Sequence, residues 1–223
     1  MRQNAPPLPI RAVISDFGGV LSLPLLRGFA AFQDESGVSM EQLGSAMLAG
    51  ADDLDGRHPL YELECGRITE ERFLDLIRDG LAVELGHRPK LHRFKEIFFE
   101  ALQPNPPMID LMADLRDRGY RMAMLTNNVR EWEPLWRAKL PVDAIFETVV
   151  DSAFVGMRKP DPEIYELTLS RLDGVDFGEC LFVDDLEVNC ATASDLGMRT
   201  IHYRDNEQAV PEIRSALGEA VVR

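Results

Sequence analysis

The chain has 223 residues, of which 45% are hydrophobic and 28% charged, and its formal net charge at pH 7 is −14. This composition is typical of a folded globular protein and excludes a disordered or fibrous chain. No apolar run approaches the roughly 20 residues of a membrane-spanning helix, and residues 1–10 lack the apolar centre of a secretory signal. The excess of acidic residues opposes binding to nucleic acid or to an anionic membrane. We therefore expect a soluble, cytoplasmic protein that binds neither.

The first predicted element is a strand. Residues 10–16 read IRAVISD, an apolar run followed by Gly18 and Gly19, which is typical of a buried strand that enters a tight turn. From about residue 24 to 102 the apolar residues recur at three- and four-residue spacing, and glycines separate the segments. This stretch predicts four or five packed helices.

After the prolines at positions 104, 106 and 107, strands and helices alternate. The pattern predicts strands at about 120–126, 145–150, 180–184 and 199–202, and helices at about 108–118, 130–139, 162–172, 188–196 and 206–217. Alternation of this kind predicts βαβ units, so the fold class is α/β with a doubly wound, Rossmann-like parallel sheet. We expect a core domain of residues 1–22 and 103–223, with a helical domain of residues 23–102 inserted after the first strand.

Polar residues stand where the predicted strands end, which is where ligands bind in open parallel sheets. Asp16 ends the first strand, and a basic loop precedes the helix at 162–172. Two further strands end at Thr126-Asn127-Asn128 and at Asp184-Asp185, and the basic loop is Arg158-Lys159. Carboxylates that gather at one edge repel one another unless a cation lies between them, and hard oxygen ligands suit Mg²⁺ better than zinc. Taken alone, Asp16 and Thr126-Asn127 also fit a turn or a helix cap, and Lys159 also fits an isolated surface lysine.

In combination these segments resemble the four motifs of the haloacid dehalogenase superfamily of hydrolases. The segments are DFGGV from Asp16, MLTNN, RKPDPEIY and CLFVDDLEVN. Residues 64–69, ECGRIT, are similar to the E-x-G-x-I-[ST] segment of the group that holds bacterial glucose-1-phosphate phosphatase and the N-terminal phosphatase domain of soluble epoxide hydrolase. The resemblance implies that residues 23–102 are a helical cap.

The resemblance also implies a role for each matching residue. A Mg²⁺-dependent phosphatase is expected, monomeric or homodimeric, which acts on a small phosphorylated, sugar-phosphate-like metabolite through an aspartyl-phosphate. The implied catalytic residues are Asp16 as nucleophile, Thr126 and Asn127 on the phosphoryl group, and Lys159 as the neutralising cation. The implied metal ligands are Asp16, the Gly18 carbonyl, Asp185 and Asp184, of which Asp184 is either a direct ligand or a neighbour of one. The candidate substrate-binding residues are Gly19, Asn128, Arg158, Arg57 and His58.

One position departs from the family pattern and leaves three alternatives. Typical phosphatases of the superfamily carry an acid two residues after the nucleophile, where this chain has Gly18. Either His58 or Glu62 replaces that acid, or the chain is a haloacid dehalogenase or phosphonatase-type hydrolase, or it is a weakly catalytic phosphometabolite-binding protein. A phosphonatase would need a lysine of the insertion, Lys90 or Lys95. Asn189 and Asp195, further along the last motif, are expected at a helix surface and a helix end.

Overall fold

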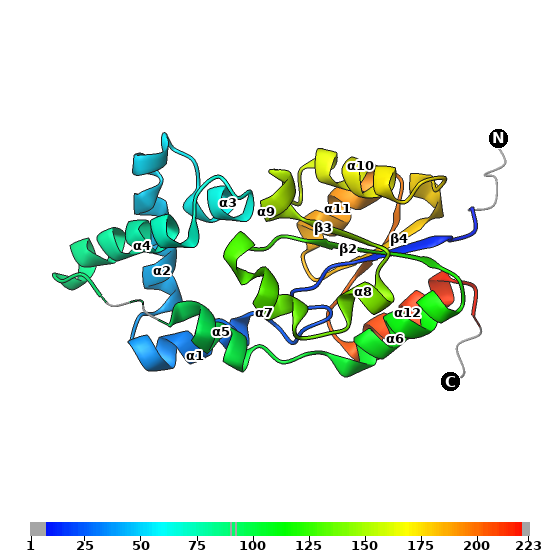
Figure 1. Cartoon of the computed structure of the whole chain (residues 1–223), viewed down its shortest axis with the longest axis horizontal. Coiled ribbons are helices and arrows are strands. Elements are labelled where there is room, and N and C mark those ends of the chain that lie inside the picture. The colour runs from blue at the N-terminus through cyan, green and yellow to red at the C-terminus, as the bar shows by residue number, and fades with distance from the viewer. Residues whose placement is uncertain (1–7, 90, 92, 220–223) are drawn as a thin grey trace.

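The structure is a computed structural model that describes residues 8–89, 91 and 93–219. The ends of the predicted core domain, residues 1–7 and 220–223, and Lys90 lie outside the described residues. The described chain forms a sheet flanked by helices and a separate group of helices at one end of that sheet (Figure 1). No helix of the described residues is both long and apolar enough to cross a bilayer.

The described residues form one five-stranded parallel sheet with strand order β3-β2-β1-β4-β5. Its strands are β1 (Ala12–Ser15), β2 (Arg121–Thr126), β3 (Thr148–Asp151), β4 (Cys180–Asp184) and β5 (Arg199–His202). The central strand β1 pairs in parallel with β2 and β4, with Ser15 opposite Met124 and Val183. The carboxyl ends of these three strands therefore lie side by side at one edge.

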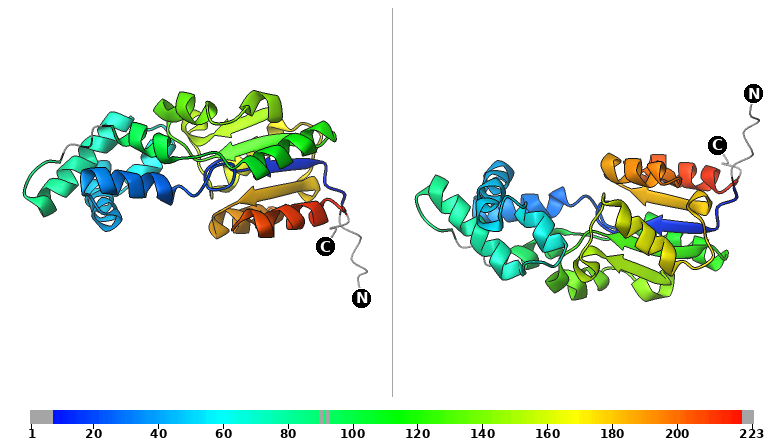
Figure 2. Two further views of the ribbon diagram at one scale, coloured as in Figure 1. Left: turned by 90° about the horizontal axis from the view of Figure 1, so that it is seen from below. Right: turned by 90° about the horizontal axis from the view of Figure 1, so that it is seen from above.

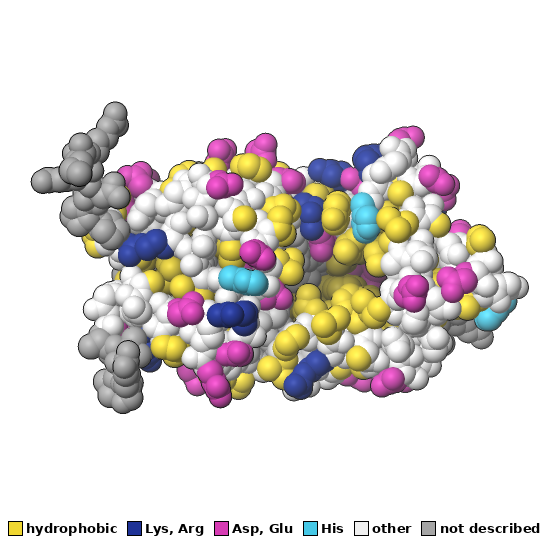
Figure 3. Space-filling view, turned by 180° about the vertical axis from the view of Figure 1, so that it is seen from behind, with side chains coloured by type: hydrophobic (Ala, Val, Ile, Leu, Met, Phe, Trp, Pro, Cys, Tyr) yellow, Lys and Arg dark blue, Asp and Glu magenta, His cyan; other side chains and the backbone are white. Residues whose placement is uncertain are grey.

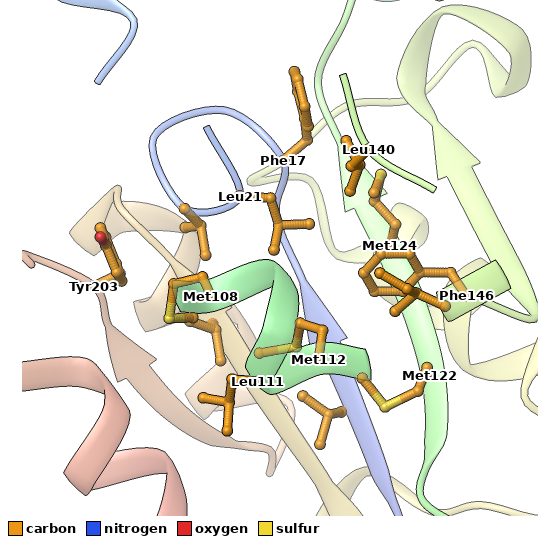
Figure 4. Close-up of a cluster of buried hydrophobic side chains, with 14 of the residues drawn as sticks. Phe17, Leu21, Met108, Leu111, Met112, Met122, Met124, Leu140, Phe146 and Tyr203 are labelled. Carbon is orange, nitrogen blue, oxygen red and sulfur yellow. The ribbon is translucent and has the colours of Figure 1, made fainter. Parts of the chain in front are cut away.

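Helices cover both faces of the sheet, as Figure 2 shows from two sides. Side chains alternate between the faces, so Val13 packs into one hydrophobic cluster while Ala12 and Ile14 pack into another. The first cluster, shown in Figure 4, includes residues of α6 (Pro106–Asp117), α8 (Val142–Ile145) and α12 (Asn206–Ala216). The second includes residues of α10 (Pro162–Arg171) and α11 (Glu187–Asp195). The predicted doubly wound α/β fold is confirmed.

Between β1 and α6 the described chain forms a helical insertion, whose first helix begins at Leu26 and whose last ends at Ala101. Its α-helices, within the described residues, are α1 (Leu26–Ser36), α2 (Met40–Gly50), α3 (Pro59–Glu64), α4 (Glu70–Leu85) and α5 (Phe94–Ala101). Ser39 and Thr69 cap two of them by accepting backbone N–H groups. The insertion has its own apolar cluster, in which Phe32, Ile77 and Leu81 are buried. The predicted helical insertion after the first strand is therefore confirmed.

Two predicted boundaries on the core are wrong. The strand expected at 145–150 begins only at Thr148, because Ile145 is the last residue of α8. Ile145 is buried in the α6 and α8 layer, and a short apolar run does not distinguish a buried helix end from a strand. The helix expected at 130–139 is a 3₁₀ turn, Arg130–Trp132, followed by the short α7, Glu133–Arg137. Pro134 lies in the first turn of α7, where proline favours the start of a helix.

Glycine allows α2 and α4 of the insertion to pack closely. A Cβ atom added at Gly80 of α4 would lie 2.8 Å from the Cα of Ala46 and 2.9 Å from its carbonyl oxygen in α2. The helices would have to separate, so we expect Gly80→Ala to lower the free energy of unfolding by about 1–3 kcal/mol.

Gly44→Ala provides the matched control, because nothing lies within 4 Å of a Cβ atom added there on α2. Alanine favours a helix over glycine, so this variant should be unchanged or up to about 1 kcal/mol more stable. Urea denaturation of both variants measures the difference. Equal stabilities would show that the α2–α4 contact does not depend on Gly80.

Candidate active site

A buried lysine joins two carboxylates at the carboxyl edge of the sheet. The Nζ atom of Lys159 lies 2.8 Å from Oδ1 of Asp16 and 2.6 Å from Oδ2 of Asp184. Asp16 follows β1 and Asp184 ends β4, so the neighbouring strands bring the two carboxylates together. The exposed fractions of Lys159, Asp16 and Asp184 are 1%, 7% and 0%. In such a buried setting each charge depends on its partners.

The side chain of Asn127, just beyond β2, holds the backbone of Lys159. Its Oδ1 accepts the Lys159 N–H at 2.8 Å, and its Nδ2 donates to the Lys159 carbonyl oxygen at 2.9 Å. The predicted role of Asn127 was to bind a phosphoryl group. The structure engages both polar atoms of its side chain in placing the lysine, so the side chain does not bind a phosphoryl group in this arrangement.

Asp184 is fully engaged by protein groups. Its Oδ1 accepts hydrogen bonds from the Leu186 N–H and from Nδ2 of Asn189, both at 2.9 Å, while Oδ2 faces Lys159. Asn189, expected at a helix surface, is only 2% exposed and faces inward from the first turn of α11. The sequence reasoning therefore missed Asn189 as a residue that orients Asp184.

Three carboxylates converge in a group that could hold a cation. One oxygen each of Asp16, Asp184 and Asp185 lies within 4.8 Å of the others. The turn after β1 approaches this group closely, since a Cβ atom added at Gly19 would lie 2.3 Å from Oδ2 of Asp185. Gly19 also has a φ of +80°, which glycine adopts at little cost. Hard oxygen donors in this arrangement fit Mg²⁺.

The protonation of the group reflects burial and like charges. Burial raises the pKa of Asp16 to about 7, although Lys159 lowers it. Burial and the nearby Asp184 raise the pKa of Asp185 to about 6. Burial alone would lower the pKa of Lys159, but Asp16 and Asp184 outweigh it and the pKa is raised. One ammonium thus faces three acids, and a further cation would favour their charged forms.

The insertion contacts the residue before Lys159. Arg158 donates from Nε to Oε2 of Glu64 at 2.8 Å, and its guanidinium carbon lies 3.9 Å from the ring centroid of Tyr61. His58 stacks on the same ring at 4.5 Å. Burial and then Arg158 lower the pKa of His58. Of the predicted substrate-binding residues, Arg158 and His58 therefore come together where the insertion meets the core.

The remaining predicted residues are Arg57, Glu62, Thr126 and Asn128. Arg57 pairs with Glu62 at 3.0 Å, and Glu62 also pairs with Arg67 at 2.8 Å, so both predicted residues belong to an ion-pair group inside the insertion. Thr126 is buried as the last residue of β2. The Oδ1 of Asn128 accepts the N–H of Val129, the next residue along the chain.

The fold and the site define a class of protein with a doubly wound α/β core, a charged centre at the carboxyl edge of its sheet and a helical insertion after the first strand. A model of the family described as haloacid dehalogenase-like hydrolase matches residues 10–197. The chain belongs to this family, and the resemblance found in the sequence is confirmed.

Three similar proteins illustrate the relationship. Bifunctional epoxide hydrolase 2 of Sus scrofa is 30% identical over 223 residues, which are 95% of this chain and 39% of that protein. Glyceraldehyde 3-phosphate phosphatase of Pyrococcus abyssi is 35% identical over 109 residues, 48% of this chain and 44% of that protein. A solved structure of a HAD family enzyme from Bacteroides thetaiotaomicron, in complex with magnesium and inorganic phosphate, has a TM-score of 0.66 and 26% identity, with 89% of this chain and 96% of that chain covered. The chain spans less than half the length of these two curated relatives.

Removal of the buried ammonium should destabilise the protein. In Lys159→Met, Asp16 and Asp184 face each other without a cation, so we expect the free energy of unfolding in EDTA to fall by about 3–5 kcal/mol at neutral pH. The loss should shrink as the pH falls, because protonation of either carboxylate relieves the repulsion.

Lys95→Met is the control, because Lys95 pairs with Glu70 at 3.1 Å in a more exposed setting. Its loss should cost only about 0–1 kcal/mol. Denaturation of both variants across a pH series provides the comparison. A Lys159→Met effect as small as that of Lys95→Met would contradict the structural role assigned to the ammonium.

Proposed function

We propose that the protein is a Mg²⁺-dependent phosphatase of small phosphorylated compounds that works through an aspartyl-phosphate on Asp16. The observation that carries the proposal is the group of Asp16, Asp184 and Asp185 beside the buried Lys159. Two similarities support it, the phosphatase relative from Pyrococcus abyssi and the magnesium and phosphate complex of the Bacteroides thetaiotaomicron enzyme. In this proposal the helical insertion acts as a cap over the site.

The proposed reaction has two steps. In the first, a carboxylate oxygen of Asp16 attacks phosphorus, and the bond between phosphorus and the leaving oxygen breaks. In the second, water attacks the phosphorus of the aspartyl-phosphate, which releases inorganic phosphate and regenerates the Asp16 carboxylate. Lys159 neutralises charge on Asp16 and on the phosphoryl oxygens, while the Thr126 hydroxyl and the Asn127 backbone N–H bind those oxygens.

The metal site in this proposal consists of Asp16, Asp185 and the Gly18 carbonyl. Asp184 already accepts hydrogen bonds from Leu186, Asn189 and Lys159, so its role is to orient the lysine and border the cation. Bound Mg²⁺ would supply positive charge next to the phosphoryl group.

The alternative of a phosphonatase-type hydrolase finds no support at Lys95. Chemistry through an imine needs a free amine, and the Nζ atom of Lys95 is hydrogen-bonded to Glu70. Side-chain hydrogen bonding to Glu70 raises the pKa of Lys95, which keeps the amine protonated.

Phosphate release from a panel of phosphomonoesters tests the function. We expect turnover with Mg²⁺, none in EDTA, and a loss of several powers of ten in Asp16→Asn, because the amide is a poor nucleophile. Asp185→Asn should raise the Mg²⁺ concentration required for half-maximal rate, since it removes one charged ligand.

Glu179→Gln is the control for general loss of acidic charge, because Glu179 pairs with Arg11 on the core surface. It should retain the wild-type rate. If the wild type released no more phosphate than Asp16→Asn from any ester, the phosphatase proposal would be wrong, and 2-haloacids would be the next substrates to test.

A further inference from the structure

We propose that the substrate carries its phosphate on an acidic oxygen, that of a phenol, an enol or a carboxylic acid, and that its organic part is apolar. This inference rests on the proposed phosphatase function and narrows its substrate class. It departs from the sugar-phosphate-like substrate that the resemblance implies. Two features of the structure carry it: glycine and a hydrocarbon neighbour at the usual position of the acid, and the apolar side chains that border the site.

A hydrocarbon side chain lies next to the position of the usual acid. A Cβ atom added at Gly18 would lie 3.2 and 3.3 Å from the two Cδ atoms of Leu25. Gly18 does not have a positive φ, so its backbone would accept another residue. The glycine is therefore not required by the turn, and the space next to it is apolar.

The three carboxylates that meet at the site are not available to protonate a leaving group. Asp16 is the nucleophile of the proposed reaction, and both oxygens of Asp184 accept hydrogen bonds from protein groups. Asp185 is assigned to the cation. An acid for the leaving oxygen would therefore have to come from outside this group of three.

Among its described residues the insertion offers His58, Glu62 and Glu64, and the first two are poorly suited. The lowered pKa of His58 favours the neutral ring, which is a weak acid. Both carboxylate oxygens of Glu62 are held by arginines, Oε2 by Arg57 and Oε1 by Arg67. Glu64 pairs with Arg158 at 2.8 Å. Burial raises the pKa of Glu64 more than Arg158 lowers it, so Glu64 is the candidate that an experiment has to exclude.

Without an acid, the nature of the leaving oxygen controls the rate. General acid catalysis contributes roughly 10²–10⁴-fold where it operates. A phenol, with a pKa of about 10, leaves as an anion far more readily than an aliphatic alcohol does. An enzyme that lacks the acid therefore discriminates strongly between the two kinds of ester.

Apolar side chains border the site. Leu25 lies over Gly18, Leu186 follows Asp185, and Tyr61 covers Arg158; these three side chains are 37%, 52% and 46% exposed. Figure 3 shows a hollow between the two parts of the molecule with hydrophobic side chains gathered along it. Such a surface suits an aromatic or other apolar group better than a polyhydroxylated sugar.

Phenyl phosphate and benzyl phosphate form a matched pair of test compounds, because they have similar aromatic groups but leave as a phenol and an aliphatic alcohol. We expect the wild-type enzyme with Mg²⁺ to favour phenyl phosphate in kcat/KM by roughly 10²-fold or more. Similar values for the two would overturn the inference while leaving the phosphatase proposal intact. No Asp16-dependent release from either compound, with release from another ester of the panel, would overturn the inference alone, and no release from any ester would overturn both.

Restoring the acid provides a second test. For each variant, the ratio of kcat/KM for phenyl phosphate to that for benzyl phosphate is measured. Gly18→Asp combined with Leu25→Ala, which makes room for the carboxyl group, should lower the preference for phenyl phosphate by about tenfold or more. Gly18→Asn with Leu25→Ala has the same shape without the acid and should keep the preference. Glu64→Gln should also keep it. A preference that rises in Glu64→Gln would identify Glu64 as the acid and overturn the inference.

Discussion

The ammonium of Lys159 between Asp16 and Asp184 is the interaction on which the site depends. Parallel pairing of β1 with β4 places the two carboxylates next to each other, and without a cation their repulsion would oppose that pairing at its carboxyl end. The lysine comes from the loop before α10, and Asn127 beyond β2 fixes its backbone. One buried charge thus connects four segments that are far apart in the sequence.

The convergence of these segments could be predicted because a parallel sheet brings strand ends to a common edge. Asp16, Asp184 and Asp185 follow apolar runs, and their meeting requires only the strand order. The inward position of Asn189 could not be read in the same way. A helix with polar residues on several sides does not reveal which of them faces the core, although its place in the first turn after Asp185 was a usable signal. The predicted start of β3 was wrong because a buried helix end, such as that of α8, and a buried strand both consist of apolar residues.

Contacts between the insertion and the core could not be predicted from the sequence, for a different reason. Glu64 with Arg158 and Glu70 with Trp132 are pairs of residues 94 and 62 positions apart. Charged and amphipathic side chains are usually exposed, and only the folded arrangement shows that these are held between two parts of the molecule. The same contacts place Tyr61 and His58 near the basic loop, so residues that could select a substrate are fixed by long-range pairs rather than by a local motif.

The two adjacent glycines after Asp16 show how chemistry and backbone geometry can be separated. Gly19 has a positive φ, and any side chain there would collide with the Asp185 carboxylate, so the fold itself requires it. Gly18 has neither constraint, since only the flexible end of Leu25 lies near it. Because the backbone does not require a glycine at position 18, the main consequence of this residue is that it has no functional group. The missing side chain would otherwise place a proton donor beside the leaving oxygen. The rate of the proposed reaction therefore depends on how readily the leaving group of the substrate departs as an anion.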